Sequence, residues 1–234
     1  MTDPRPVPIR HGDAALQALL VPAGEGPRPA VLIFPTIMGR SELELGFARR
    51  LAALGYTAMV ADLYGEVGLP REQCREAMNA LLADRALLQD RLLAVLEAFR
   101  AQPEVDAGRV AAIGYCFGGL CALDLARTGV DVAGVASFHG LFTPPGEGEG
   151  IPIRAKVLAL HGWDDPMVPP QAVVALGEEL TRAGADWQIH AYGGVMHGFT
   201  NPNANAPENG VEYDAAADRR SWSALEAFLA EVLA

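Results

Sequence analysis

Residues 109–119 read RVAAIGYCFGG and combine a run of apolar residues with a cysteine set among glycines. The apolar run is typical of a buried β-strand, and the segment that follows, FGGLCALDLART at 117–128, is typical of a helix. The chain is therefore expected to turn abruptly from strand into helix at Cys116. At such a turn a side chain on Gly114 or Gly118 would collide with neighbouring backbone, and the free N–H groups of the helix favour a negative charge on the sulfur.

Strand-like and helix-like segments alternate on both sides of this turn. Strands are expected at 15–21, 30–35, 56–62, 109–115, 132–138, 155–162 and 186–192, and helices at 41–55, within 70–102 (as one or two), and at 117–128, 170–183 and 213–233. Ser41 and Glu44 form a capping box at the start of helix 41–55. The alternation predicts an α/β fold with a mostly parallel, doubly wound sheet and helices on both faces. Because it continues across the loops 143–152 and 200–210, we expect a single domain over residues 1–234.

Composition and charge narrow the class of protein. Of the 234 residues, 50% are hydrophobic and 20% are charged, which suits a large buried core and argues against disorder. No apolar run approaches the ~18–20 residues of a transmembrane helix. The N-terminal MTDPRPVPIRHGD has prolines and charges where a signal peptide has an apolar core, so a cytoplasmic protein is expected. The net charge of −11 disfavours nucleic acid and anionic membranes as partners.

The chain has three cysteines, Cys74, Cys116 and Cys121, an odd number without C-x-x-C spacing. This pattern suits neither a disulfide framework nor a zinc site. We expect Cys74 and Cys121 to be structural. Around Cys116 the sequence reads G-x-C-x-G-G, the thiol counterpart of the G-x-S-x-G nucleophile elbow, in which the N–H of the next residue, Phe117, serves as an oxyanion donor. The alternative is that Cys116 is a small buried residue without chemistry.

A nucleophile of this kind needs a base and an orienting acid at later strand ends. HGWDDPMVPP at 161–170 supplies two aspartates, and YGGVMHGF at 192–199 supplies His197. The order cysteine, aspartate, histidine is that of the α/β-hydrolases. His139 and His161 also end predicted strands, and for them we expect hydrogen-bonded roles beside the site. The histidines are too dispersed in the sequence to form a metal motif.

Taken together, these segments resemble the dienelactone hydrolase family, a cysteine-nucleophile branch of the α/β-hydrolases. The motifs occur in order: PTIMG (35–39), ADLYG (61–65), IGYCFGG (113–119), DDPMVP (164–169) and HGF (197–199). The resemblance implies an α/β-hydrolase fold, Cys116 as nucleophile, Asp165 rather than Asp164 as orienting acid, and His197 as base. It also implies the Ile37 N–H as second oxyanion donor, no metal or organic cofactor, and a monomer.

Two positions depart from the pattern of family members that cleave dienelactone. Those enzymes carry a glutamate where this chain has Thr36, and an arginine where it has Asn201. A charge-assisted hydrogen bond contributes about 1.5–3 kcal/mol, so losing the arginine disfavours a carboxylate-bearing substrate. The expected substrates are therefore neutral esters or lactones. Residues expected to line the pocket are Thr36, Tyr64, Phe142, Trp163, Phe199 and Asn201.

The same chemistry extends to neutral phosphotriesters as secondary substrates, because their P=O group would occupy the position of the acyl oxyanion. Three alternatives stay open. The first is a dienelactone-type enzyme whose substrate carboxylate is bound by an arginine from the region of Arg71, Arg75 and Arg85. The second is an acyltransferase or thioesterase. The third is a non-catalytic binding protein on a hydrolase scaffold.

Overall fold

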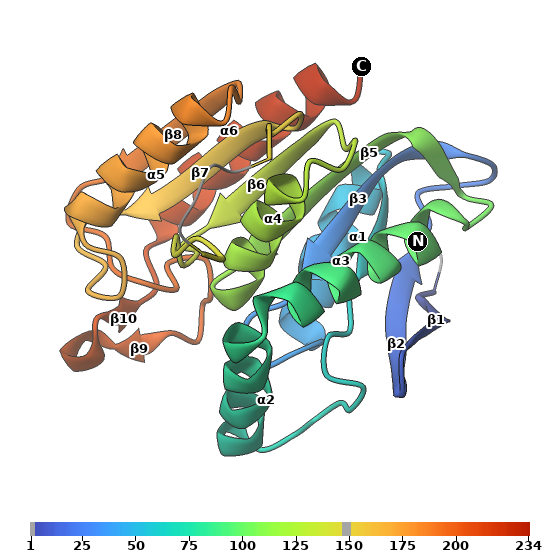
Figure 1. Cartoon of the computed structure of the whole chain (residues 1–234), viewed down its shortest axis with the longest axis horizontal. Helices are drawn as coiled ribbons and strands as arrows, with labels where there is room; N and C mark the ends of the chain where they lie inside the picture. Colours follow the sequence, from blue (N-terminus) through green and yellow to red (C-terminus); the bar gives the residue numbers. More distant parts are fainter. Residues whose placement is uncertain (1–2, 147–150) are drawn as a thin grey trace. The chain divides into compact units, whose positions relative to one another are not determined.

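The computed structural model describes residues 3–146 and 151–234 (Figure 1). The chain divides into two compact units, Met1–Ala112 and Ile113–Ala234, which are described here one at a time. A single domain over the whole chain stays a prediction. Part of the expected loop at 143–152 lies outside the described residues.

The first unit contains five strands and three helices among its described residues. They are β1 (Arg5–His11), β2 (Ala14–Val21), β3 (Arg28–Phe34), α1 (Glu42–Ala53), β4 (Thr57–Val60), α2 (Arg71–Ala83), α3 (Arg85–Arg100) and β5 (Val105–Tyr115), whose last residues belong to the second unit. The strand order is β1-β2-β4-β3-β5. β3 and β4 are parallel, whereas β2 is antiparallel to both β1 and β4.

Strand β1 was not among the expected strands, and its sequence explains why. Pro6 and Pro8 interrupt it, and proline lacks the N–H group that a central strand needs. Their side chains are exposed, whereas those of Val7 and Ile9 are buried. This alternation places the prolines on the outer face of a strand at the edge of the sheet, where they are tolerated.

Side-chain caps mark the starts of two helices of the first unit, α1 and α3. Ser41 and Glu44 form the expected capping box of α1. The helical region 70–102 is two helices, because the chain leaves helical geometry at Asp84, whose carboxylate accepts a hydrogen bond from Leu87 N at 2.9 Å and so caps α3.

The second unit carries the cysteine turn and the later strand ends. Its elements are α4 (Phe117–Arg127), β6 (Gly134–Phe138), β7 (Lys156–Gly162), α5 (Pro170–Arg182), β8 (Trp187–Tyr192), β9 (Asn205–Ala206), the 3₁₀-helix η1 (Pro207–Asn209), β10 (Val211–Glu212) and α6 (Ala215–Val232). β6, β7 and β8 are parallel neighbours. Figure 1 shows α4 and α5 in front of these strands and α6 behind them. All 11 residues of α4 are buried.

The short hairpin β9–β10 begins inside the expected loop 200–210 and ends just after it, at Glu212. Strands of two residues carry no periodicity, so no pattern predicts them. The hairpin matters because Val211 forms a β-bridge with His197.

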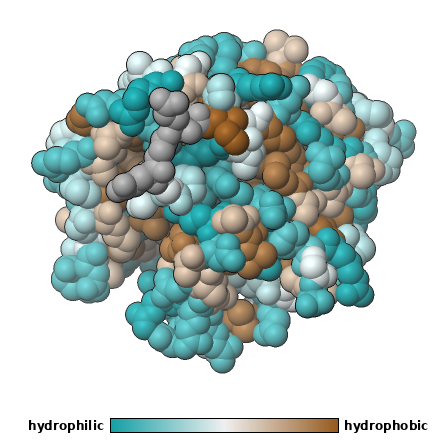
Figure 2. Space-filling model, viewed as in Figure 1, coloured by the Kyte–Doolittle hydropathy of each residue, from teal (hydrophilic) through white to brown (hydrophobic). Residues whose placement is uncertain are grey.

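Strands β1–β8 belong to one mostly parallel sheet with connecting helices, which confirms the α/β prediction. The side of the molecule drawn in Figure 2 is largely hydrophilic, with apolar residues in scattered patches. No helix within 3–146 or 151–234 is long and apolar enough to cross a membrane. In the second unit, the carboxyl ends of β6, β7 and β8 lead to His139, Asp165 and His197, so the fold gathers the predicted site there.

Candidate active site

Cys116 stands at the turn between β5 and α4 in a strained backbone conformation. Its φ is +57°, a value that few residues other than glycine adopt. The carbonyl oxygen of Phe138, the last residue of β6, accepts a hydrogen bond from Cys116 N at 3.0 Å. Cys116 is the N-cap of α4 and makes no side-chain capping bond, so the positive end of the helix dipole lies at the sulfur. Backbone strain of this kind is found at functional sites.

The glycines around Cys116 are required by close backbone contacts. A Cβ on Gly114 would lie 1.9 Å from the carbonyl oxygen of Gly118, which confirms the reason expected for Gly114. A Cβ on Gly119 would lie 2.6 Å from the Cα of Gly140. Helix α4 therefore packs directly against the end of β5 and against the chain after β6.

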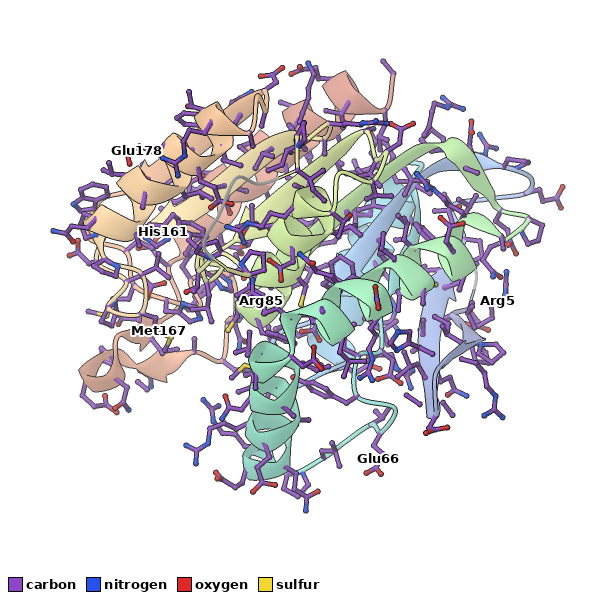
Figure 3. All side chains as sticks on the ribbon, in the orientation of Figure 1. Arg5, Glu66, Arg85, His161, Met167 and Glu178 are labelled. Atoms are coloured by element: carbon purple, nitrogen blue, oxygen red, sulfur yellow. The ribbon has the colours of Figure 1, made fainter. Side chains whose placement is uncertain are left out.

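Asp165 and His197 form a buried pair. His197 Nδ1 donates to Asp165 Oδ2 at 2.7 Å, and the two residues are 4% and 1% exposed respectively. The other oxygen of the carboxylate accepts from Met167 N at 2.9 Å, which orients it. Figure 3 labels His161, which lies in β7, and Met167, which lies in the loop after β7; Asp165 lies between them in the sequence. Asp164, by contrast, is exposed, and its N–H donates to Val195 O. The structure thus brings Asp165, rather than Asp164, to His197.

The electrostatic surroundings of His197 favour an imidazolium. Burial opposes its charge, but the hydrogen bond to Asp165, the interaction with the Cys116 side chain and the negative charge of both groups raise the pKa of His197 to about 10. Nε2 is buried, and the Cys116 side chain interacts with the ring and stabilises its charged form. The arrangement suits a cysteine thiolate paired with an imidazolium.

The loop that carries His197 is held by backbone bonds on both sides. His197 N donates to Gly210 O at 2.9 Å, and Glu212 N donates to His197 O at 3.1 Å. Asp214 N, at the start of α6, donates to Phe199 O at 3.2 Å. The hairpin that the sequence did not predict thus fixes the predicted base.

Two further histidines are buried beside this pair and are hydrogen-bonded, as expected. His161 Nε2 donates to Val168 O at 3.0 Å, and burial lowers the pKa of His161. His139 Nε2 is hydrogen-bonded to Thr200 Oγ1 at 2.9 Å. Burial, with the charge of His197, holds the pKa of His139 well below its usual value. His139 is thus a neutral ring next to a charged one.

The predicted pocket residues of the second unit differ in how far they are exposed to solvent. Phe142 is buried, with its ring 5.2 Å from that of His161. Phe199 is fully buried in a cluster with Val195, whereas Trp163 is 41% exposed.

Thr36 and Ile37 lie on the loop between β3 and α1, and Tyr64, which follows β4, contacts this loop. Glu44 Oε1 accepts from Thr36 N at 3.1 Å, and the Tyr64 hydroxyl donates to Ile37 O at 3.1 Å. Glu44 is completely buried, and its other oxygen accepts from Ser41. Its contact with Thr36 was not expected, because the capping box accounts only for the bonds to Ser41. Glu44 therefore holds both ends of the loop 36–41.

An open groove of about 700 Å³ lies elsewhere in the second unit, between α5 and β8. It is lined by Val173, Val174, Gly177, Glu178, Thr181, Arg182, Trp187, Ile189 and Ala191, none of which is a predicted site residue.

Comparison with known proteins decides the family. The sequence profile of the dienelactone hydrolase family matches residues 16–233. The chain belongs to the dienelactone hydrolase family. It is accordingly a hydrolase with the α/β-hydrolase fold, as the motifs implied.

Two curated sequences illustrate the relatives of this dienelactone hydrolase family member. Among curated sequences, an uncharacterized protein of Caenorhabditis elegans, K02A2.1, is 40% identical over 153 residues, covering 63% of this chain and 95% of the relative. A putative carboxymethylenebutenolidase of Yersinia pestis is 28% identical over 187 residues, covering 74% and 69%.

Two solved structures match nearly end to end. One, called m3DLH, has 37% identity and a TM-score of 0.90, with 99% of both chains covered. The other is described as a dienelactone hydrolase-like promiscuous phosphotriesterase from metagenomic libraries; it has 35% identity, a TM-score of 0.90 and the same 99% coverage.

The two positions where this family member departs from the dienelactone-cleaving pattern are occupied by turn residues. Thr36 Oγ1 accepts from Met38 N at 3.4 Å. Asn201 Oδ1 accepts from Asn203 N at 3.0 Å, so the carboxamide stabilises its own loop. The buried arginine of the second unit, Arg127, binds Asp124 and Glu179. None of these three side chains supplies an uncommitted positive charge for a carboxylate.

Proposed function

We propose that this dienelactone hydrolase family member hydrolyses neutral esters or lactones through a Cys116–His197–Asp165 triad and a thioacyl-enzyme. The observation that carries the proposal is the buried 2.7 Å bond between His197 and Asp165, next to a cysteine at the strained N-terminus of α4. A base oriented by a carboxylate and facing a thiol is the arrangement that covalent acyl transfer needs.

The proposed reaction has two halves. The Cys116 thiolate attacks the acyl carbon, and the N–H groups of Phe117 and Ile37 stabilise the oxyanion. The tetrahedral adduct expels the alkoxide, which takes the Nε2 proton of His197, and a thioester remains. Neutral His197 then removes a proton from a water that attacks the thioester, and the thiolate leaves. Removing one oxyanion donor typically costs about 10²–10³ in rate.

The proposed preference for uncharged substrates rests on Thr36 and Asn201, the two positions that differ from the pattern of dienelactone-cleaving enzymes. Asn201 replaces an arginine and is engaged with Asn203, so it offers a carboxylate no charge. The competing proposal is an anionic lactone held by Arg71, Arg75 or Arg85. If hydrolysis of an anionic lactone saturates and collapses when one of these arginines becomes alanine, the preference for neutral substrates is wrong.

The covalent step is tested by acid-quenched intact-protein mass spectrometry after millisecond mixing with a 4-nitrophenyl ester. We expect an acyl mass on the wild type and on Cys121→Ala, and none on Cys116→Ala. Cys121 is the matched control because it is a buried thiol in the same helix, α4. Undiminished hydrolysis by Cys116→Ala would refute the triad. A wild type that neither hydrolyses the ester nor reacts with iodoacetamide at neutral pH would favour a binding protein.

Transfer to other acceptors is tested in the same assay. We expect water to be the acceptor, with free acid as product. Ester products formed on addition of alcohols, or faster cleavage of thioesters than of oxygen esters, would favour an acyltransferase or thioesterase.

A secondary phosphotriesterase activity is favoured by one specific comparison. The structural neighbour with 35% identity is described as a promiscuous phosphotriesterase. We propose that this chain also cleaves neutral aryl phosphotriesters, with Cys116 displacing the aryl oxide. Turnover of paraoxon by the wild type, and its loss in Cys116→Ala, is the expected result. Equal rates of paraoxon cleavage by the wild type and Cys116→Ala would exclude this activity of Cys116.

A further inference from the structure

His139 occupies an unusual position directly after β6. Its φ is +37°, and Cys116 and His139 are the two non-glycine residues with positive φ in the part of the chain that the structure describes. Its N–H donates to Leu160 O at 2.8 Å. The residue before it, Phe138, accepts the hydrogen bond from Cys116 N. The end of β6 is therefore bonded to the predicted nucleophile.

The His139 side chain reaches from there to the loop of the predicted base. Nε2 is hydrogen-bonded to Thr200 Oγ1 at 2.9 Å, and Thr200 follows His197 by three positions. The other ring nitrogen, Nδ1, makes no hydrogen bond to a described residue, so Thr200 is the polar partner of the ring. His139 and Thr200 are 2% and 3% exposed, and at this depth a lost hydrogen bond is not replaced by bulk water.

The ring also contacts His197 directly. The two ring centroids are 5.1 Å apart at an interplanar angle of 66°, so the rings meet edge to face. Phe199 contacts His139 from another side, also at 5.1 Å, with an angle of 82°. Rotation of the His197 ring away from its bond with Asp165 would have to displace a buried side chain that is itself bonded and packed.

We propose that His139 is a positioning residue that sets the separation of Cys116 and His197. The proposal rests on the proposed function, in which these two residues exchange a proton. Two consecutive residues make the two contacts. The carbonyl oxygen of Phe138 binds the backbone of the nucleophile, and the side chain of His139 binds the loop that carries the base. A change in the position of these two residues changes the geometry of both reacting groups, and a shift of 1 Å can cost about 10²-fold in rate.

The strained backbone of His139 fits this role. A left-handed conformation is unfavourable for a histidine, and such conformations persist where the surrounding structure enforces them. Gly140 follows, and a Cβ there would lie 2.2 Å from Ser137 Oγ and 2.9 Å from the backbone of Gly119. The tight contact between Gly140 and α4 leaves the chain little freedom, so the side chain of His139 is directed by the same contact that seats the cysteine helix.

The neutral state of His139 is part of the same arrangement. The titratable groups that face it are Tyr115 from β5, His161 from β7 and His197 from the loop after β8. A second positive charge beside the His197 imidazolium would repel it. The buried ring therefore supplies a hydrogen bond and an aromatic edge without competing for the proton of the triad.

The test combines two substitutions with two readouts. His139→Asn keeps a polar group and tolerates a left-handed backbone but is too short to contact the His197 ring. Thr200→Val keeps the shape and removes the hydroxyl. His190→Asn, in strand β8, is the matched histidine control. The readouts are kcat and KM for a 4-nitrophenyl ester, and the pH midpoint of Cys116 alkylation by iodoacetamide, which does not depend on turnover.

We expect His139→Asn to lower kcat about 10-fold or more, with little change in KM, and to raise the alkylation midpoint. Thr200→Val should act in the same direction by a smaller factor. The double variant should be no worse than His139→Asn, since the two residues share one hydrogen bond. His190→Asn should behave as wild type.

Three results would overturn the proposal: folded single variants with unchanged kcat and midpoint, an effect on KM alone, or effects that multiply in the double variant. If His139→Asn does not fold, Thr200→Val decides by the same two readouts. Failure of the proposed function is separate, since it would show as full activity in Cys116→Ala.

Discussion

The carboxylate of Asp165 and the imidazole of His197 are joined by a 2.7 Å hydrogen bond in almost complete isolation from solvent. In the neutral form of His197 this bond keeps the proton on Nδ1 and leaves Nε2 as the basic nitrogen. Removing the charge while keeping the shape, with Asp165→Asn, should favour the wrong tautomer. We expect kcat to fall by about 10²–10⁴, as measured with a 4-nitrophenyl ester. Asp164→Asn is the control, and comparable losses in both variants would contradict the assignment.

The raised pKa of His197 gives stability a pH dependence with a definite sign. An unfolded histidine has a pKa near 6.5, whereas folding raises the pKa of His197 to about 10. The folded state thus binds the proton more tightly, and this contribution is complete below pH ~6.5 and is lost as pH rises towards 10.

Urea unfolding at several pH values measures this contribution. Between pH 6.5 and 10 the wild type should lose more unfolding free energy than His197→Gln. Cys116→Ala should move the loss to lower pH, because the Cys116 side chain helps to raise the pKa of His197. Parallel curves for wild type and His197→Gln would show that the imidazolium is not stabilised by folding.

Close packing at the cysteine turn predicts an intolerant glycine. Gly114→Ala would place its Cβ 1.9 Å from Gly118 O and 2.9 Å from Gly119 N, and these are backbone atoms that cannot rotate away as a side chain can. We expect a loss of about 3 kcal/mol or more in unfolding free energy, or no folded protein. Gly46→Ala is the matched control: it lies in α1 with nothing within 4 Å of its Cβ, and should stabilise the protein by about 0.5–1 kcal/mol. A well-folded Gly114→Ala would show that the elbow is looser than described.

A buried ion pair joins α4 to α5. The Arg127 side chain is 6% exposed; its Nε donates to Glu179 at 2.7 Å and its NH1 donates to Asp124 at 3.1 Å. Its NH2 also donates to Phe142 O at 3.0 Å. Arg127→Met would remove the cation that is paired with the fully buried Asp124 and should cost about 3–5 kcal/mol, measured by denaturant unfolding. The exposed pair of Arg75 and Glu72 is the comparison, and Arg75→Ala should cost about 0.5 kcal/mol or less. Equal costs would show that burial does not distinguish the two pairs.

Much of the fold followed from local pattern, and the failures have physical causes. The buried strands β3, β6 and β7 are mostly apolar, and the capping box of Ser41 and Glu44 marks the start of α1. The sequence did not predict strand β1, because its prolines argue against a strand unless its position at the edge of the sheet is known. The sequence also did not predict the hairpin β9–β10, because strands of two residues are too short to show an alternation of polar and apolar residues.

In the candidate site, too, the sequence predicted some features and missed others. Spacing alone pointed to Cys116, His197 and an aspartate pair, because a nucleophile elbow and later strand ends have recognisable sequences. It did not reveal the second contact of Glu44, with Thr36, nor the bond between His139 and Thr200. Neither contact leaves a periodic or motif signal.

The sequence by itself determined the α/β class, the turn at Cys116 and the chain order of the three reactive residues, since each depends on neighbours along the chain. The family resemblance implied Asp165 rather than Asp164, and the tertiary structure shows the hydrogen bond between Asp165 and His197. Only the tertiary structure decided that His139 lies against the same ring. These choices depend on the rotation of a loop side chain and on residues 61 positions apart, such as His139 and Thr200, meeting in a buried space. Packing selects one arrangement of this buried site. Any other arrangement would leave a buried polar group without its hydrogen-bond partner, which is destabilising.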